Sequence, residues 1–227
     1  MLKRSYFVVA LTLVVTIALT GCEPPKKPVK KKPKKKKPPV VVVPKTPEKK
    51  PLTPTSYPSV AAAIDALEKA SIERNNVDIK HAEDWLVMQG NRAIDELGTT
   101  LNDESAKIER RLPAGRVLSR LGPSAASKLI EATKSSTSQV QRDSINKLGR
   151  IKPSSTEIVT MLIELMDHED DRIRVLAMSS LKTIGPSASR SKDRLVAILN
   201  DTTQPRIVRD AAKKALEVVD KRSSFVN

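Results

Sequence analysis

The chain has 227 residues, which is enough for one ordinary domain and some accessory segments. Aromatic residues make up only 2% of it, which favours packed helices over a β-sandwich, and its single cysteine excludes an intramolecular disulfide. The formal net charge is +15, but residues 59–227 carry only +3 of it. The basic charge therefore belongs to an N-terminal tail, and this argues against a nucleic-acid-binding domain, whose charge lies on the folded surface.

The first 22 residues have the organisation of a secretory signal peptide. Lys3 and Arg4 precede an almost wholly apolar run over residues 6–19, which is too short for a comfortable membrane span of about 20 residues. The run ends in Leu19-Thr20-Gly21-Cys22, which resembles the bacterial lipobox. That resemblance implies a lipid on the Cys22 thiol and an exported protein held on a membrane of the cell envelope by acyl chains such as palmitate. The alternative is an uncleaved anchor followed by a chance cysteine.

Residues 23–58 contain eleven Pro and twelve Lys, with two Glu and no Gly. Pro removes amide donors and the lysines repel one another, so this segment is predicted to be an extended, disordered tether. In polyproline II conformation it would span about 110 Å, at roughly 3.1 Å per residue. We interpret it as a solvated spacer. A compatible second interpretation is that its lysines bind anionic lipid head groups or wall polymers.

The rest of the chain is punctuated by similar breaks. Leu121-Gly122-Pro123-Ser124-Ala125 returns as Ile184-Gly185-Pro186-Ser187-Ala188, and Ile151-Lys152-Pro153-Ser154 lies between the two. A Gly after the last apolar residue ends a helix, and the Pro that follows prevents its continuation. The sequence therefore predicts several helical units, each about 30–35 residues long by the spacing of the prolines.

Each predicted unit is a helical hairpin. Before the break at Gly185, apolar residues recur with helical spacing at Ile173, Ala177, Leu181 and Ile184. An earlier apolar helix precedes each such stripe, and these first helices are predicted at Ala93–Leu101, Leu129–Ala132, Ile158–Met166 and Leu195–Leu199. No single hairpin can bury its stripe alone, so we expect the hairpins to stack as an α-solenoid.

The pattern is similar to HEAT repeats, especially the short bacterial kind, over roughly residues 91–220. The residues that carry the similarity are Asp167…Ile173-Arg174…Ala177…Leu181…Ile184-Gly185-Pro186 and Asp201…Val208-Arg209…Ala212…Leu216. Earlier units depart from it, because Arg110 takes an apolar site and Gln141 replaces the usual Arg. The resemblance implies an all-α fold, an α-solenoid of stacked HEAT-like hairpins over residues 59–222. Residues 59–90 would form a cap or degenerate repeat, and residues 223–227 a disordered tail.

No arrangement of residues has the spacing of a catalytic, cofactor-binding or metal site. His168 beside Glu169, Asp170 and Asp171 suggests a cation site, but we interpret the carboxylates as caps of the following helix. Trp85 is interpreted as a core residue of the cap, with ligand stacking as the alternative. HEAT-like bacterial proteins include phycobilin lyases, but no pigment-handling residues are found here, so we expect a protein that is not an enzyme.

Solenoids usually bind partners on the concave face, which is made by the second helix of each hairpin. The outward basic positions there, and hence our candidate partner-binding residues, are Arg116, Arg120, Arg150, Lys182 and Lys214. The sequence thus predicts a protein–protein interaction scaffold in the cell envelope, with an unknown protein partner and no nucleic acid. Two alternatives stay open. One is a structural envelope-organising protein whose basic tether binds anionic wall or lipid polymers, and the other is a solvated face that binds nothing.

Overall fold

The computed structural model describes residues 56–221, and within this range every regular element is a helix. The predictions for Cys22, for residues 23–55 of the tether and for the C-terminal tail lie outside the described residues. The helices are α1 (Val60–Ile72), α2 (Asn76–Met88), α3 (Ile94–Asn102), α4 (Ile108–Leu121), α5 (Ala126–Ala132), α6 (Ser138–Leu148), α7 (Thr156–Glu164), α8 (Asp171–Ile184), α9 (Lys192–Asn200) and α10 (Arg206–Val219). Short 3₁₀ helices join some of them, namely η1 (Gly90–Ala93), η2 (Gly122–Ala125), η3 (Leu165–Asp167) and η4 (Gly185–Ser191).

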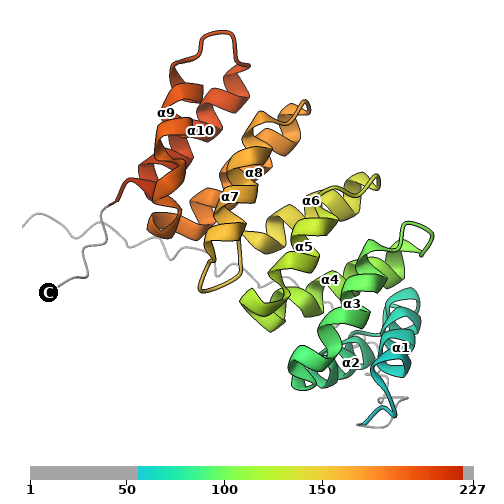
Figure 1. Cartoon of the computed structure of the whole chain (residues 1–227). Coiled ribbons are helices and arrows are strands. Elements are labelled where there is room, and N and C mark those ends of the chain that lie inside the picture. The colour runs from blue at the N-terminus through green and yellow to red at the C-terminus, as the bar shows by residue number, and fades with distance from the viewer. Residues whose placement is uncertain (1–55, 222–227) are drawn as a thin grey trace, which may run out of the picture. The chain divides into compact units, whose positions relative to one another are not determined.

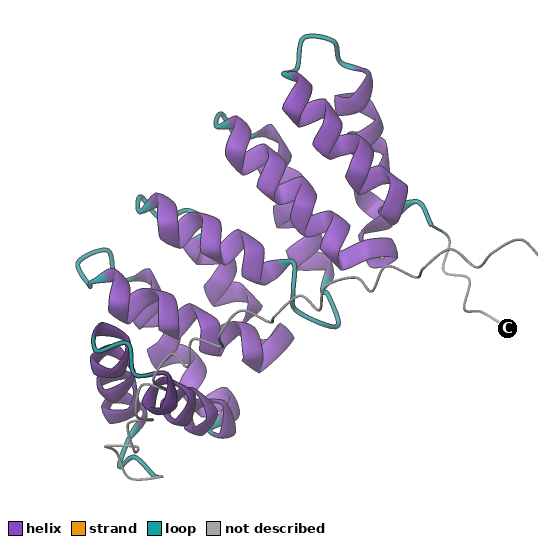
Figure 2. Ribbon diagram, turned by 180° about the vertical axis from the view of Figure 1, so that it is seen from behind, coloured by secondary structure: helices purple, strands orange, loops and turns teal. Residues whose placement is uncertain are grey.

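Consecutive helices pair into hairpins that stack side by side along a row (Figure 1). The second helices α4, α6, α8 and α10 form one continuous layer, which Figure 2 shows from behind, and the first helices form the other. Neighbouring second helices contact one another more extensively than neighbouring first helices do. The row therefore curves toward the second helices, and we call that side the second-helix face. The predicted α-solenoid of HEAT-like hairpins is confirmed.

The acidic turn before α8 caps that helix. The Asp170 carboxylate accepts the backbone N–H of Arg172 at 2.8 Å, and Nδ1 of His168 accepts the N–H of Asp170 at 3.0 Å. Both groups thus satisfy amides that the helix itself leaves free. The capping interpretation of this turn is confirmed, and the histidine belongs to the cap.

Glycine is required at two of the breaks between hairpins. Gly122 and Gly185 have φ of +79° and +81°, a region that side-chain-bearing residues rarely adopt. Pro123 and Pro186 come next, and each opens a 3₁₀ turn that leads into the following first helix. At the intervening break Lys152 replaces the glycine, and its ammonium donates to the carbonyl oxygens of Thr183 and Ile184 at 3.1 and 3.0 Å. This lysine therefore binds the C-terminal end of α8 in the next hairpin.

The predicted stripe of α8 is the buried one. Ala177 and Leu181 are fully buried, and Ile173 and Ile184 nearly so. The matching prediction for Leu216 in α10 is wrong, because this side chain is only partly buried while Ala215 is fully buried. Leu216 lies on the last described hairpin, where no further hairpin follows within residues 56–221 to cover it.

The first hairpin, α1 with α2, covers the N-terminal end of the row. Trp85 of α2 is partly buried against the core and meets Tyr57 edge to face, with ring centroids 5.4 Å apart. Tyr57, which the composition assigned to the tether, therefore packs on the folded domain. The aromatic pair belongs to the packing of this cap, in keeping with the core interpretation of Trp85.

Leu181→Ala should lower the free energy of unfolding by about 2–5 kcal/mol, because it leaves a cavity in the core of an interior hairpin. Lys182→Ala, one position along on the exposed side, should change it by no more than about 0.5 kcal/mol. Urea unfolding of the full chain followed by circular dichroism measures both. Equal effects of the two substitutions would show that the α8 stripe does not face the core.

Candidate functional site

Two of the predicted partner-binding residues are already paired within the chain. Nε of Arg116 lies 2.6 Å from Oε1 of Glu83, and Nη2 of Arg120 lies 2.6 Å from Oδ1 of Asp84. A second nitrogen of Arg120 lies 3.5 Å from Glu83. Both carboxylates come from α2, so the cap hairpin neutralises this end of the second-helix face. Arg116 and Arg120 therefore fix the cap to α4.

The other three predicted residues, Arg150, Lys182 and Lys214, are exposed and form no ion pair within residues 56–221. Arg150 lies just beyond the end of α6. Lys182 and Lys214 are brought together, because both line one hollow between α8 and α10. The structure thus divides the five predicted residues into a paired end, a single exposed arginine and a lysine pair.

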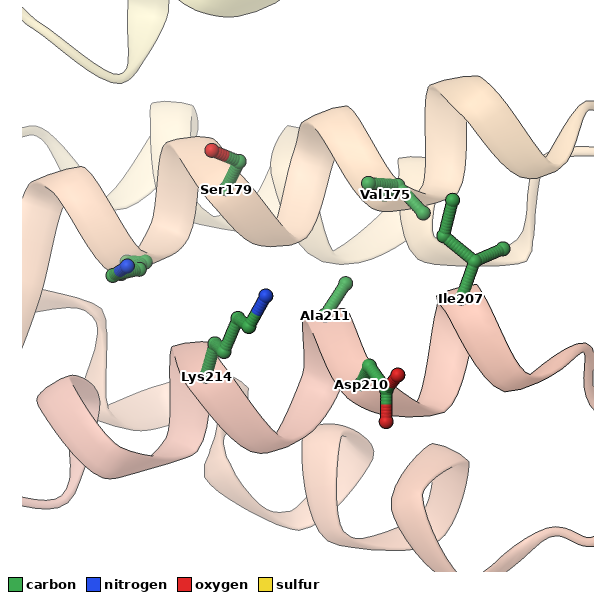
Figure 3. Close-up of a pocket in the computed structure, with 7 residues that line it drawn as sticks. Val175, Ser179, Ile207, Asp210, Ala211 and Lys214 are labelled. Carbon is green, nitrogen blue, oxygen red and sulfur yellow. The ribbon is translucent and has the colours of Figure 1, made fainter.

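That hollow, which we call the α8–α10 groove, has a volume of about 370 Å³ and is shown in Figure 3. It is lined by Val175, Ser179, Lys182, Ile207, Asp210, Ala211 and Lys214. On α8 the lining residues are Val175, Ser179 and Lys182, and on α10 they are Ile207, Ala211 and Lys214, which is the same i, i+4, i+7 spacing. Each wall therefore runs from an aliphatic residue through a small one to a lysine.

The groove has one aliphatic end and one basic end. Val175 and Ile207 lie together at the first end, and Ile207 is 62% exposed (Figure 3). The single carboxylate of the lining, Asp210, lies 3.7 Å from Nε of Arg206 on the same helix. The lining therefore has two lysines against one carboxylate, and its net charge is positive.

The aliphatic half of this groove was not predicted from the sequence. Analysis of the stripes assigned Val208 and Ala212 to the core, and this leaves Ile207 and Ala211 facing outward. The signal in the sequence was Ile207, an isoleucine at an outward position, followed seven residues later on the same side by Lys214. The sequence does not give the distance between α8 and α10, and that distance is what turns the two walls into one groove.

A second residue missed by the sequence analysis is Arg111, which is 1% exposed and links two hairpins. Its guanidinium donates to the Leu101 carbonyl at 2.9 Å, to Thr137 at 3.0 Å and to Glu104 at 3.1 Å. It precedes Arg174 by the same 63 residues that separate Gly122 from Gly185, and this spacing could have revealed it. Arg174 itself pairs with Asp171 and donates to the His168 carbonyl at 3.1 Å.

The Glu104 carboxylate is the anionic centre of the network around Arg111. Hydroxyls of Ser135 and Ser136, from the turn of the next hairpin, each donate to it at 2.6 Å. These two hydrogen bonds, followed by the one from Arg111, lower the pKa of Glu104 to about 2, since each stabilises the ionised carboxylate. The network therefore joins the α3–α4 and α5–α6 turns most strongly when Glu104 is charged.

Acidification should weaken this junction. Because the folded pKa of Glu104 is depressed, its stabilisation is complete above the unfolded value near 4.5 and is lost as the pH falls toward 2. Urea unfolding at a series of pH values should show the wild type more stable than Glu104→Gln at pH 7, with the gap closing between about pH 4.5 and 2. The exposed Glu131→Gln is the control, and a gap that stays constant down to pH 2 would contradict the network.

No group of three or more His, Cys, Asp or Glu side chains in residues 56–221 is arranged to hold a metal ion. None of the helices within that range combines the length and the apolar character needed to cross a membrane. The α8–α10 groove therefore remains the candidate site that the geometry supports best.

Residues 126–217, from α5 to most of α10, match the family model described as HEAT repeats. No curated protein matches the chain. Among solved structures, a chain of the CpcE–CpcF complex of phycocyanin lyase from Nostoc sp. PCC7120 is similar with a TM-score of 0.52 and 22% identity. The match covers 68% of this chain and 98% of that one. Human deoxyhypusine hydroxylase in complex with glycerol gives a TM-score of 0.50 and 20% identity, over 70% of this chain and 63% of the human one.

At these identities the likeness shows the fold alone. Together with the family match over residues 126–217 it supports a helical scaffold with HEAT-like repeats. Both neighbours are named for enzymes, so the expectation that this protein is not an enzyme stays a prediction.

Proposed function

We propose that this protein is an exported, lipid-anchored bacterial lipoprotein whose HEAT-like repeats act as a protein–protein interaction scaffold in the cell envelope. The observation that carries the binding role is the α8–α10 groove, where an exposed isoleucine and two unpaired lysines share one hollow on the second-helix face. Protein interfaces combine an apolar centre with charged groups at the rim, and this groove offers both. The scaffold binds its partner without catalysing a reaction.

The anchor is supported by the sequence of the first 22 residues. A basic start, a short apolar run and Leu19-Thr20-Gly21-Cys22 occur in the order of a lipoprotein signal, and a Pro-rich segment follows directly. Two or three acyl chains hold a protein firmly on a membrane, since each buried CH₂ contributes about 0.8 kcal/mol. The tether then gives the scaffold reach away from the lipid.

Cys22→Ser should abolish the lipid anchor, because serine offers no thiol for the diacylglyceryl group. We expect the variant to lose incorporation of radiolabelled palmitate and to keep its signal peptide, which gel mobility and mass spectrometry would report. Cys22→Ala should behave in the same way. A variant that matures to normal size and still partitions into detergent would contradict lipid attachment at this residue.

The twelve lysines of residues 23–58 favour a second candidate function. In it, the tether binds anionic wall or lipid polymers and the repeats space or stiffen the envelope. Deleting residues 26–50 distinguishes the two functions, because the deletion removes all twelve of these lysines and leaves the described helices intact.

A scaffold without residues 26–50 should still capture the same partner from envelope extract as the full-length chain, as judged by affinity capture and mass spectrometry. Partner capture should persist even if the deletion weakens binding of the protein to isolated cell wall and to anionic vesicles. If the deletion abolishes both partner capture and envelope association, the structural function replaces the scaffold.

A further inference from the structure

We propose that the α8–α10 groove binds an acidic segment of a partner protein, in which one aliphatic side chain and one carboxylate are recognised together. The aliphatic side chain lies between Val175 and Ile207, and the carboxylate lies between Lys182 and Lys214. This inference rests on the proposed scaffold function and deepens it, because it specifies the chemistry of the partner.

The spacing of the walls sets the spacing of the ligand. Lys182 stands seven positions after Val175 on its helix, and Lys214 stands seven positions after Ile207. At 1.5 Å per residue this is a distance of about 10 Å along each helix. Two side chains on the same side of a segment are about 10 Å apart when they stand seven residues apart on a helix or three apart on a polyproline II chain, which has three residues per turn. The groove therefore selects segments with an Asp or Glu at one of these distances from a Leu, Ile or Val.

Charge determines the sign of the partner. Lys182 and Lys214 line the same hollow without an ion pair within residues 56–221, so an anion placed between them experiences attraction from both. Asp210 also lines the hollow, 3.7 Å from the exposed Arg206, so the lining has two lysines against one carboxylate and carries a net positive charge. Lys147, which also belongs to a second helix, is buried and paired with Asp143. Arg150, just beyond the end of α6, is another exposed cation of this face without an ion pair within residues 56–221.

The aliphatic end distinguishes a protein segment from other anions. Burying the exposed Ile207 side chain removes apolar surface from water, and only a ligand that is itself partly apolar gains from this. Membrane surfaces and nucleic acids are held by larger clusters of cations than this pair of lysines. A volume of about 370 Å³ is at the small end of the range for ligand sites and suits a few side chains of a peptide.

The test is selection of displayed random 12-residue peptides on the full-length protein in detergent. Peptides that bind the lysine-rich tether are removed beforehand on the double variant Lys182→Glu/Lys214→Glu, which carries the same tether. A second double variant, Lys134→Glu/Lys213→Glu, changes the net charge equally at exposed positions outside the groove and serves as the control. Circular dichroism melting should show that both variants keep the wild-type fold.

Recovered peptides should carry an acidic residue three or seven positions from an aliphatic one. Fluorescence anisotropy with one such peptide should show binding weakened about tenfold or more by Lys182→Glu/Lys214→Glu, and at least threefold by Ile207→Ser. The control double variant should bind within about twofold of the wild type. Replacing the acidic residue of the peptide by Gln or Asn should weaken binding to the wild type as much as the lysine variant does.

Several results of the peptide selection, and one of partner capture, would overturn the proposal. One is that no peptide is enriched over the lysine variant, and a second is that the enriched peptides lack acidic residues. The third is that the lysine variant loses binding to phosphatidylglycerol vesicles or loses self-association, while peptide binding is absent.

Partner capture from envelope extract that is unchanged in the lysine variant would refute the groove and leave the scaffold function standing. If acidic peptides bind the groove but no partner is captured from envelope extract, the scaffold function is refuted and the groove's preference for acidic segments stands.

Discussion

Each hairpin of this protein has an apolar stripe that it cannot bury without the next hairpin, and the rest of the structure depends on that constraint. Stacking is close because small residues lie where the second helices meet. A Cβ atom on Gly149, directly after α6, would lie only 2.8 Å from Cβ of Ser180 on α8, and the Ser180 hydroxyl donates to the Ile145 carbonyl at 3.0 Å. Ala177 and Ala212 are likewise fully buried. Because the second helices approach more closely than the first helices do, the row bends toward them and presents their outer residues on one continuous face.

The same stacking decides which charges on that face remain available. At the N-terminal end the acidic residues Glu83 and Asp84 of the cap pair with Arg116 and Arg120, so the charges there serve assembly of the domain. Between α8 and α10 no such carboxylate reaches Lys182 or Lys214 within the described residues, and the walls frame the exposed Ile207. The face thus has one end whose charges are paired within the chain and another end whose charges can pair with a partner. Its outward residues, rather than its fold, determine what the scaffold can bind.

Much of the fold could be predicted because its signals are local. Gly122 and Gly185 mark helix ends through a backbone conformation that favours glycine, and the stripe from Ile173 to Ile184 gives the buried side of α8. Prediction from the sequence was wrong where burial or pairing of a side chain depends on the adjacent hairpin. Leu216 repeats the pattern of Leu181 but is only partly buried, because burial at that position requires a following hairpin. Likewise, the basic residues of the site were identified from their outward positions, whereas their pairing with α2 and the aliphatic half of the groove depend on distances between helices that periodicity does not contain.

The claim that the second-helix face binds a protein partner can be tested most directly by photo-crosslinking in intact cells. A photoreactive amino acid would replace Ser179 in the groove or, as a matched control on the same pair of hairpins, the exposed Ala197 of α9 on the first-helix side. Irradiation should give a discrete adduct with another protein from position 179 and none from position 197, and Lys182→Glu/Lys214→Glu should abolish that adduct. Adducts that form equally from both positions, or only from position 197, would contradict a partner-binding site on the second-helix face.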